Sequence, residues 1–206
     1  MSKGDYLTAI LRSPKTVFTL KDIALLWHEP AAEAARVRLN YYVNRGDLYR
    51  IRKGLYAKSV QYNNLELATR ILTPAYVSFE TMLVKEGLIF QYYEPVFIAS
   101  YTTRTITVEG QIYAFRKIKD TVLINSLGIE HVDETSVASR ERAFLDMLYA
   151  SSSYHFDNLR SLNWDRVFEI LPIYANQRMA KSTTSIYQKE NRNNKEEQYQ
   201  RHCSSH

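Results

Sequence analysis

Cysteine is almost absent from this chain, since Cys203 is the only one among 206 residues. One thiol cannot close a disulfide within a chain, so a disulfide framework is excluded and a reducing compartment is expected. No run of 18 apolar residues occurs, and residues 1–5 have no apolar stretch. We therefore expect neither a signal peptide nor a membrane span, and a cytoplasmic location.

Recognisable catalytic motifs are also missing. The sequence has no glycine-rich phosphate loop, no G-x-S-x-G and no evident nucleophile–base pair. Histidine and cysteine come close together only in the tail, at His202, Cys203 and His206, where no folded shell is expected to hold a metal. We expect no catalytic residue, no metal, no cofactor and no enzymatic activity.

The chain carries an excess of positive charge, and this excess is distributed unevenly along the sequence. Residues 1–60 carry 11 Lys and Arg against 5 Asp and Glu, a net charge of +6, whereas residues 61–187 carry 12 against 14, a net charge of −2. A concentrated basic segment favours a polyanionic partner, because each neutralised phosphate releases counterions. The alternative is a solvated basic surface.

The basic third predicts three helices followed by a β-hairpin. We expect helices over residues 5–11, 20–28 and 30–45, with Thr19 and Asp22 as a capping box for the second. Gly46 ends the third helix as a left-handed cap, and Lys53-Gly54 is the hairpin turn. This order is typical of a winged helix-turn-helix, which places a helix in the major groove and a basic hairpin beside the backbone.

The predicted third helix has a buried face of small and apolar residues and an outer face that is mostly polar and flanked by arginines. Small and apolar residues share its inner face, at Ala32, Ala35, Leu39, Tyr42 and Val43. Its outer face carries Glu33, Val37, Asn40, Tyr41 and Asn44, and its flanks carry Arg36, Arg38 and Arg45. Arg36 and Arg38 are candidates for reading guanine, with phosphate contact or solubility as alternatives. Asn40 is a candidate for contact with a DNA phosphate, or is a solvated residue. Tyr41 is a candidate for contact with the DNA backbone, or packs against the hairpin.

On the hairpin, the exposed cations Arg50, Arg52 and Lys53 are predicted to contact phosphates. A second domain over residues 61–187 follows, so the fold class is α+β: a winged helix-turn-helix, then a mixed α/β domain with a small sheet and flanking helices. Its helices are predicted near residues 64–72, 79–86, 140–149 and 165–171, and its strands near 96–101, 104–108, 111–117, 122–124 and 136–138. Residues 188–206 are polar and predicted to be structureless.

Two charged residues of the second domain lie four apart, Arg142 and Asp146. Residues at this spacing meet on one face of a helix, so we predict a structural ion pair that ties residues 140–149 to the sheet. A catalytic role for Asp146 needs a further carboxylate or metal ligand from elsewhere in the chain.

Three stretches resemble AbiEi-type antitoxins, the antitoxins of bacterial type IV toxin–antitoxin systems. They are Gly46-Asp-Leu-Tyr-Arg-Ile-Arg-Lys-Gly-Leu-Tyr56, Pro74-Ala-Tyr-Val-Ser-Phe-Glu-Thr-Met-Leu-Val-Lys-Glu-Gly-Leu88 and Val137-Ala-Ser-Arg-Glu-Arg-Ala-Phe-Leu-Asp146. The resemblance implies repression of the chain's own promoter, cooperative self-association on DNA, and an action against a nucleotidyltransferase-like (AbiEii-like) toxin without a stable complex. It also implies that the DNA-facing residues are Arg36, Arg38, Asn40, Arg45, Arg50, Arg52 and Lys53.

Three alternatives remain open on the sequence. The second domain could sense a small ligand in an ordinary transcription factor, or be a nuclease or nucleotidyltransferase tethered to DNA. The winged helix could also bind a protein in place of DNA. The operator, the toxin and the oligomeric state are not specified by the sequence.

Overall fold

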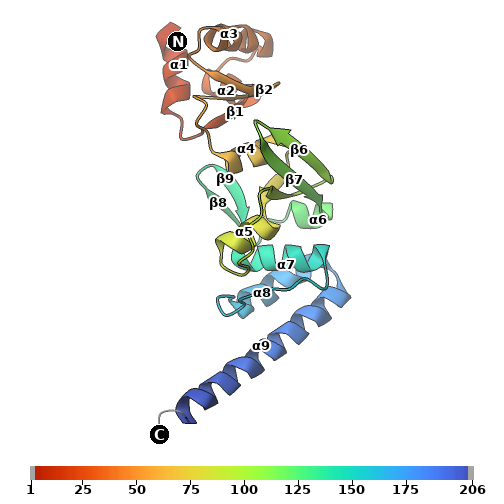
Figure 1. Cartoon of the computed structure of the whole chain (residues 1–206). Helices are drawn as coiled ribbons and strands as arrows, with labels where there is room; N and C mark the ends of the chain where they lie inside the picture. The colour runs from red at the N-terminus through yellow and green to blue at the C-terminus, as the bar shows by residue number, and fades with distance from the viewer. Residues whose placement is uncertain (1–2, 204–206) are drawn as a thin grey trace.

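The structure is a computed structural model that describes the backbone of residues 3–203 and the side chains of residues 5–192. It is α+β, with a mixed sheet and flanking helices. The chain forms an N-terminal unit at one end of an elongated molecule, a larger unit in the middle, and a long helix at the other end (Figure 1).

The N-terminal unit contains three helices and a three-stranded sheet in the order β1-β3-β2. Its elements are α1 (Lys3–Arg12), β1 (Val17–Thr19), α2 (Leu20–Leu26), α3 (Ala32–Asn44), β2 (Tyr49–Arg52) and β3 (Leu55–Ala57). The predicted capping box is confirmed: Thr19 Oγ1 accepts a hydrogen bond from Asp22 N, and Asp22 Oδ2 accepts one from Thr19 N. The predicted helix 20–28 ends earlier, and β1 was not predicted.

Alternation along these short strands divides the small sheet between two cores. Phe18 and Tyr56 face α1–α3, whereas Val17, Leu55 and Ala57 join the larger core of the rest of the chain. Because successive strand residues point to opposite faces, the sheet is covered on both sides. The hydrophobic core therefore crosses residue 60, where the sequence predicted a domain boundary.

The second unit is built on a six-stranded mixed sheet in the order β6-β7-β5-β4-β9-β8. Its strands are β4 (Ala75–Val77), β5 (Val96–Ser100), β6 (Arg104–Val108), β7 (Gln111–Lys117), β8 (Ile129–Val132) and β9 (Thr135–Ala138). Its helices are α4 (Asn64–Ile71), α5 (Phe79–Lys85), α6 (Asp120–Leu123), α7 (Arg140–Ala150), α8 (Trp164–Ile170), the 3₁₀ helix η1 (Leu171–Tyr174) and α9 (Gln177–Cys203).

Most predicted elements of this unit are found, and three predictions fail. Residues 122–124, predicted as a strand, lie at the end of α6 and its C-cap. Ser78 precedes α5 as expected, but its hydroxyl makes no capping bond and donates to Asp146 instead, at 2.7 Å. Residues 188–203, predicted to be structureless, continue α9, because a polar segment without glycine or proline retains good helix formers.

Polar contacts fix the N-terminal unit against the second unit. The buried Glu66 carboxylate accepts hydrogen bonds from Thr16 N at 2.8 Å and Thr16 Oγ1 at 2.6 Å. Asp22, the capping residue of α2, pairs with Lys15 at 2.7 Å and Arg70 at 3.4 Å. Burial raises the pKa of Asp22, but the hydrogen bonds from Lys15 and Thr19 outweigh it, so this pKa lies below its usual value.

A second polar contact lies at the turn of the β6–β7 hairpin. Tyr49 of β2 and Tyr62 both donate a hydrogen bond to the Glu109 carboxylate. These two bonds lower the pKa of Glu109. The turn itself is the predicted Glu109-Gly110, with both residues at positive φ. The N-terminal unit is therefore held at two separate places.

Candidate nucleic-acid interface

Helix α3 lies at the outer end of the N-terminal unit (Figure 1), and its inner face is packed against the core. Ala35, Leu39 and Tyr42 are buried, as the amphipathic pattern predicts. The helix ends at Asn44, and Gly46 follows with φ +79°, a left-handed conformation that glycine adopts without a Cβ penalty. This turn leads the chain directly into β2, so the helix and the hairpin are close neighbours.

The hairpin β2–β3 exposes a row of cations. Ile51 is buried between Arg50 and Arg52, and these two exposed side chains point away from the core. A bulge lies between Arg50 and Arg52, and the turn falls at Lys53-Gly54 as predicted. Among the side chains that the structure describes, those of Arg50, Arg52 and Lys53 make no hydrogen bond or ion pair.

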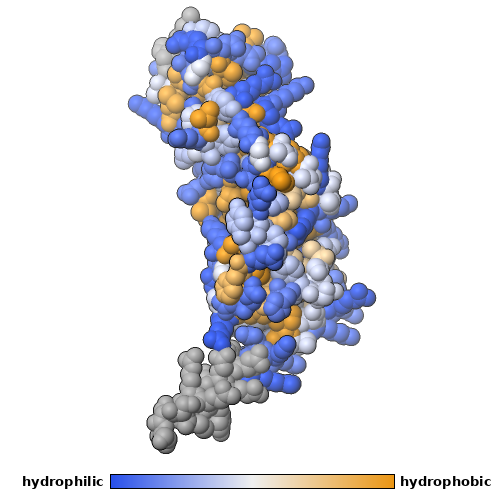
Figure 2. Space-filling view, in the orientation of Figure 1, coloured by the Kyte–Doolittle hydropathy of each residue, from blue (hydrophilic) through white to orange (hydrophobic). Residues whose placement is uncertain are grey.

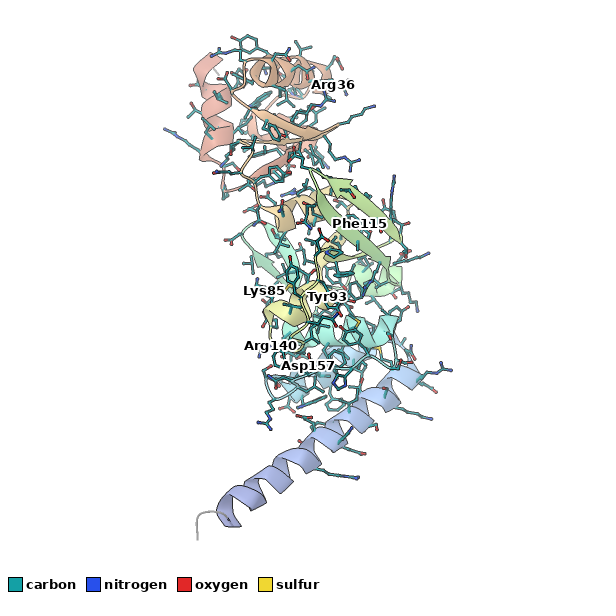
Figure 3. All side chains as sticks on the ribbon, viewed as in Figure 1. Arg36, Lys85, Tyr93, Phe115, Arg140 and Asp157 are labelled. Carbon is teal, nitrogen blue, oxygen red and sulfur yellow. The ribbon has the colours of Figure 1, made fainter. Side chains whose placement is uncertain are left out.

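A groove of about 460 Å³ lies between α3 and the hairpin, and it collects four of the predicted residues. It is lined by Leu20, Arg36, Asn40, Arg50, Lys53, Gly54 and Tyr56. Figure 3 labels Arg36 on the side of α3 near the hairpin. Arg36 pairs with Glu33 at 2.8 Å, and both side chains are exposed. Surface pairs of this kind are worth only about 0–1 kcal/mol, so Arg36 can exchange its partner.

The structure places three other predicted residues on the opposite flank of α3. Arg38 stacks over the ring of Tyr6, with 3.9 Å from Cζ to the centroid, and pairs with Glu29 at 3.3 Å. Only 28% of its side chain is exposed. Arg38 therefore packs α1 against α3, and sequence periodicity alone did not separate it from Arg36.

Tyr41 and Arg45 form the rest of this flank. Arg45 Nη1 donates to the Tyr41 hydroxyl at 2.8 Å, and Arg45 Nε pairs with Asp47 at 3.1 Å. Tyr41 packs edge-on against the ring of Tyr42, at 5.5 Å between centroids, which is a different contact from the predicted packing against the hairpin. Both Tyr41 and Arg45 remain exposed at the surface.

The predicted ion pair in the second unit is confirmed and fully buried. Arg142 Nε lies 3.3 Å from Asp146 Oδ1, and both side chains have no exposed surface. Asp146 also accepts hydrogen bonds from the hydroxyls of Tyr76, Ser78 and Tyr174. Burial raises the pKa of Asp146, and Arg142 and the three hydroxyls oppose that rise. Asp146 therefore joins α7 to β4 and to the 3₁₀ helix η1 in the core of the second unit.

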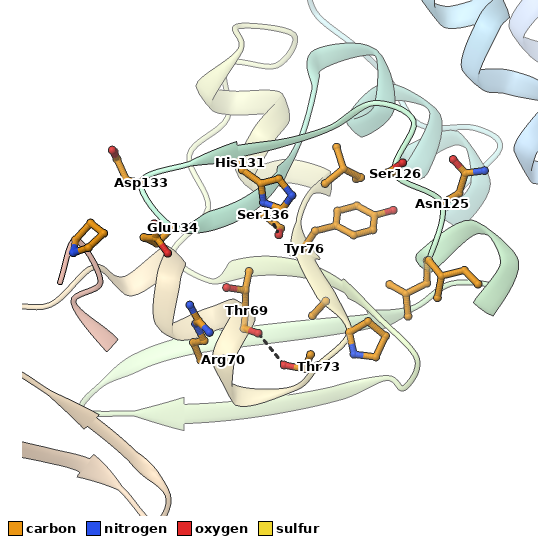
Figure 4. Close-up of a pocket in the computed structure, with 16 residues that line it drawn as sticks. Thr69, Arg70, Thr73, Tyr76, Asn125, Ser126, His131, Asp133, Glu134 and Ser136 are labelled. Carbon is orange, nitrogen blue, oxygen red and sulfur yellow. Dashed lines mark hydrogen bonds between the residues drawn. The ribbon is translucent and has the colours of Figure 1, made fainter. Parts of the chain in front are cut away.

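A larger hollow of about 1070 Å³ lies beside this cluster, between α4, β4 and the β8–β9 hairpin (Figure 4). Its walls are mixed: Arg70, Thr69 and Thr73 come from the α4 side, and His131 and Ser136 from the hairpin. Ser136 Oγ lies 3.2 Å from His131 Nδ1. Pro14 also lines it, so the hollow borders the junction between the two units.

No protein-family model matches the chain, and no curated protein matches it significantly. Among the described residues, no helix is long and apolar enough to cross a membrane. Within the same part of the chain, no three His, Cys, Asp or Glu residues come together as a metal site. The tail candidates His202, Cys203 and His206 lie outside the side chains that the structure describes.

Proposed function

We propose that this protein binds duplex DNA through α3 and the β2–β3 hairpin, as a winged helix-turn-helix transcriptional regulator. The observation that carries the proposal is the groove in which Arg36, Asn40, Arg50 and Lys53 converge from two elements. Arg50 and Lys53 have no ion-pair partner among the described residues, so they can neutralise phosphates without breaking an ion pair, whereas Arg36 must leave Glu33. The net charge of +6 in residues 1–60 supports the same choice of partner. Hydrophilic side chains project from this end of the molecule (Figure 2).

The resemblance to AbiEi-type antitoxins supports a more specific role. Under that role, the protein represses its own promoter, several copies occupy the operator cooperatively, and the second unit counters a nucleotidyltransferase-like toxin without a stable complex. A neighbouring gene for such a toxin provides the test. Producing this chain should restore growth of cells that express the toxin, and unchanged toxicity would reject the antitoxin role while leaving DNA binding intact.

DNA binding is tested by a salt titration with the chain's own promoter. Each lost phosphate contact reduces the log–log salt slope by about 0.9, so Arg50→Ala/Arg52→Ala should flatten it by about 1.8. The matched control is Arg104→Ala/Lys117→Ala, which removes two exposed cations from the ends of β6 and β7 that lie away from Glu109. If the first variant binds like the parent at every salt concentration, the assignment of the hairpin is wrong.

A ligand-responsive regulator is a second candidate, favoured by the hollow between α4 and the β8–β9 hairpin. Its position beside Pro14 would let a bound molecule act on the junction with the N-terminal unit. A metabolite that raises the melting temperature and changes the affinity for DNA would support this candidate. A screen in which stabilising compounds leave DNA affinity unchanged would argue against it.

A further inference from the structure

Val37 lies on the outward face of α3 and has no role in folding that the structure shows. Its side chain is 64% exposed, so it buries little apolar surface. Valine is also a weaker helix former than alanine, because its branched side chain loses rotamer freedom in a helix. Its exposed methyl groups therefore call for a different explanation.

The side chains around Val37 are placed so that they complement the edges and the floor of the DNA major groove. On one side of α3, Arg36 lines the groove shared with the hairpin cations, and on the other side Arg45 is exposed. Between these cations, Val37 and Asn40 form an uncharged strip, and Glu33 on the same outward face pairs with Arg36. In the major groove, phosphates line both edges and the base edges lie between them. The cations thus match the phosphates, and the uncharged strip matches the bases.

Asn40 complements Val37 in the chemistry that it offers. The two residues are three apart, so their side chains are neighbours on the helix surface. Asn40 is exposed, and among the described residues its side chain makes no hydrogen bond. An asparagine amide can bond adenine N6 and N7 together, and an apolar side chain contacts the methyl group of thymine. Arg36, in contrast, must first leave Glu33 to read a guanine.

We infer that Asn40 and Val37 read A·T pairs in the major groove, with Asn40 on an adenine and Val37 on the methyl group of a nearby thymine. The inference rests on the proposed DNA-binding function and adds the bases that are recognised. The hollow that adjoins Val37 offers mainly apolar surface to the thymine methyl, from Tyr6, Ala34 and Tyr41 among others, although Glu33 and Arg38 also line it.

The test uses the full chain and a site selected from random duplex DNA. Replacing single thymines by uracil removes only the methyl group. At one thymine the parent should lose about fourfold in affinity, the equivalent of one buried methyl group. Val37→Ala should bind the thymine and uracil duplexes equally. Val60→Ala, a control at another exposed valine, should keep the fourfold difference.

Asn40→Ala provides the second arm. The parent should discriminate between A·T and G·C at the adenine by about 5- to 150-fold, and the variant should lose this preference. If the parent selects a site but no uracil substitution matters, or if Val37→Ala stays sensitive to uracil, the inference fails while DNA binding stands. Equal binding to all sequences also overturns it. If no duplex is retained at any salt concentration, the proposed function fails first.

Discussion

The arginines of the two units have opposite environments. Arg142 has no exposed surface, and besides Asp146 its guanidinium donates to Tyr76 Oη at 2.9 Å and to the carbonyls of Val122 and Leu127, each at 2.7 Å. Arg50 and Arg52 project from a hairpin without a side-chain partner among the described residues. Arginine thus stabilises the buried core through hydrogen bonds in one unit, and is an exposed cation without a side-chain partner in the other.

The difference follows from what surrounds each charge. A buried ion loses its water, so it is stable only when protein groups replace every lost hydrogen bond. An exposed cation keeps its water until a ligand displaces it. Basic content alone therefore does not locate an anion-binding surface, and the residues to test are those whose charge is not already satisfied.

The largest effect is expected at the buried pair. Arg142→Ala leaves Asp146 as an uncompensated buried charge, and should lower the free energy of unfolding by about 3–5 kcal/mol. Urea denaturation followed by circular dichroism measures this loss. The double variant Arg142→Met/Asp146→Leu should lose less than the single variant, because it removes both charges. An equal loss in the two variants would contradict the ion-pair explanation.

Gly128 lies against Arg142, and its substitution should destabilise the fold nearly as much. It has φ +76°, and a Cβ there would come within 2.8 Å of Ile170 Cδ1 and 2.9 Å of Arg142 Cβ. Gly128→Ala combines backbone strain with overpacking and should cost about 2–4 kcal/mol. Gly110→Ala, at φ +87° with no atom within 4 Å, isolates the strain and should cost about 1 kcal/mol. Similar unfolding free energies for the two variants would reject the steric contribution.

Asp22→Asn tests the junction between the units, with an expected loss of about 1 kcal/mol from its two ion pairs. The pKa of Asp22 is lowered in the folded state, so its contribution is present above the unfolded pKa, near 3.8. It is lost as the pH falls through the folded pKa. The difference between parent and variant in thermal unfolding should therefore be constant near neutral pH and shrink below about pH 4. A difference that persists in acid would contradict this role.

The smallest effects on stability are expected for the arginines of the hairpin and of α3. Arg50→Ala/Arg52→Ala should change the free energy of unfolding by less than about 0.5 kcal/mol, because exposed, unpaired side chains contribute little. Arg38→Ala should cost about 1 kcal/mol through the lost contact with the ring of Tyr6, with little effect on the salt slope of DNA binding. Equal stabilities would show that Arg38 is as open as the hairpin cations.

Local signals account for the parts of the fold that were predicted correctly. The capping box of Thr19 and Asp22, the left-handed Gly46 and the Glu109-Gly110 turn each depend on a few adjacent residues. The Arg142–Asp146 pair was also predictable, since i, i+4 spacing on a helix is local. In contrast, β1 and β4 have only three residues each, and their pairing partners lie far away in the sequence. β8 pairs with the neighbouring β9, but it has only four residues and three of them are exposed.

The candidate site was predictable in its composition but not in its arrangement. Periodicity placed both Arg36 and Arg38 on the flanks of α3, and did not say which of them faces the hairpin. The position of α1 decides which arginine faces the hairpin. Arg38 stacks on the ring of Tyr6 in α1, whereas Arg36 lines the groove beside the hairpin. Ser78 is a similar case, since a distant carboxylate, Asp146, takes the hydroxyl that the local pattern assigned to a helix cap.

The sequence by itself determined the concentration of positive charge in the first sixty residues, the amphipathic third helix and most helix boundaries, because these depend on neighbours along the chain. The tertiary structure alone decided which cations remain unpaired, and that a single sheet separates two cores. Those properties depend on contacts between residues far apart in sequence, such as Thr16 with Glu66 and Tyr49 with Glu109. A spacing rule cannot supply them.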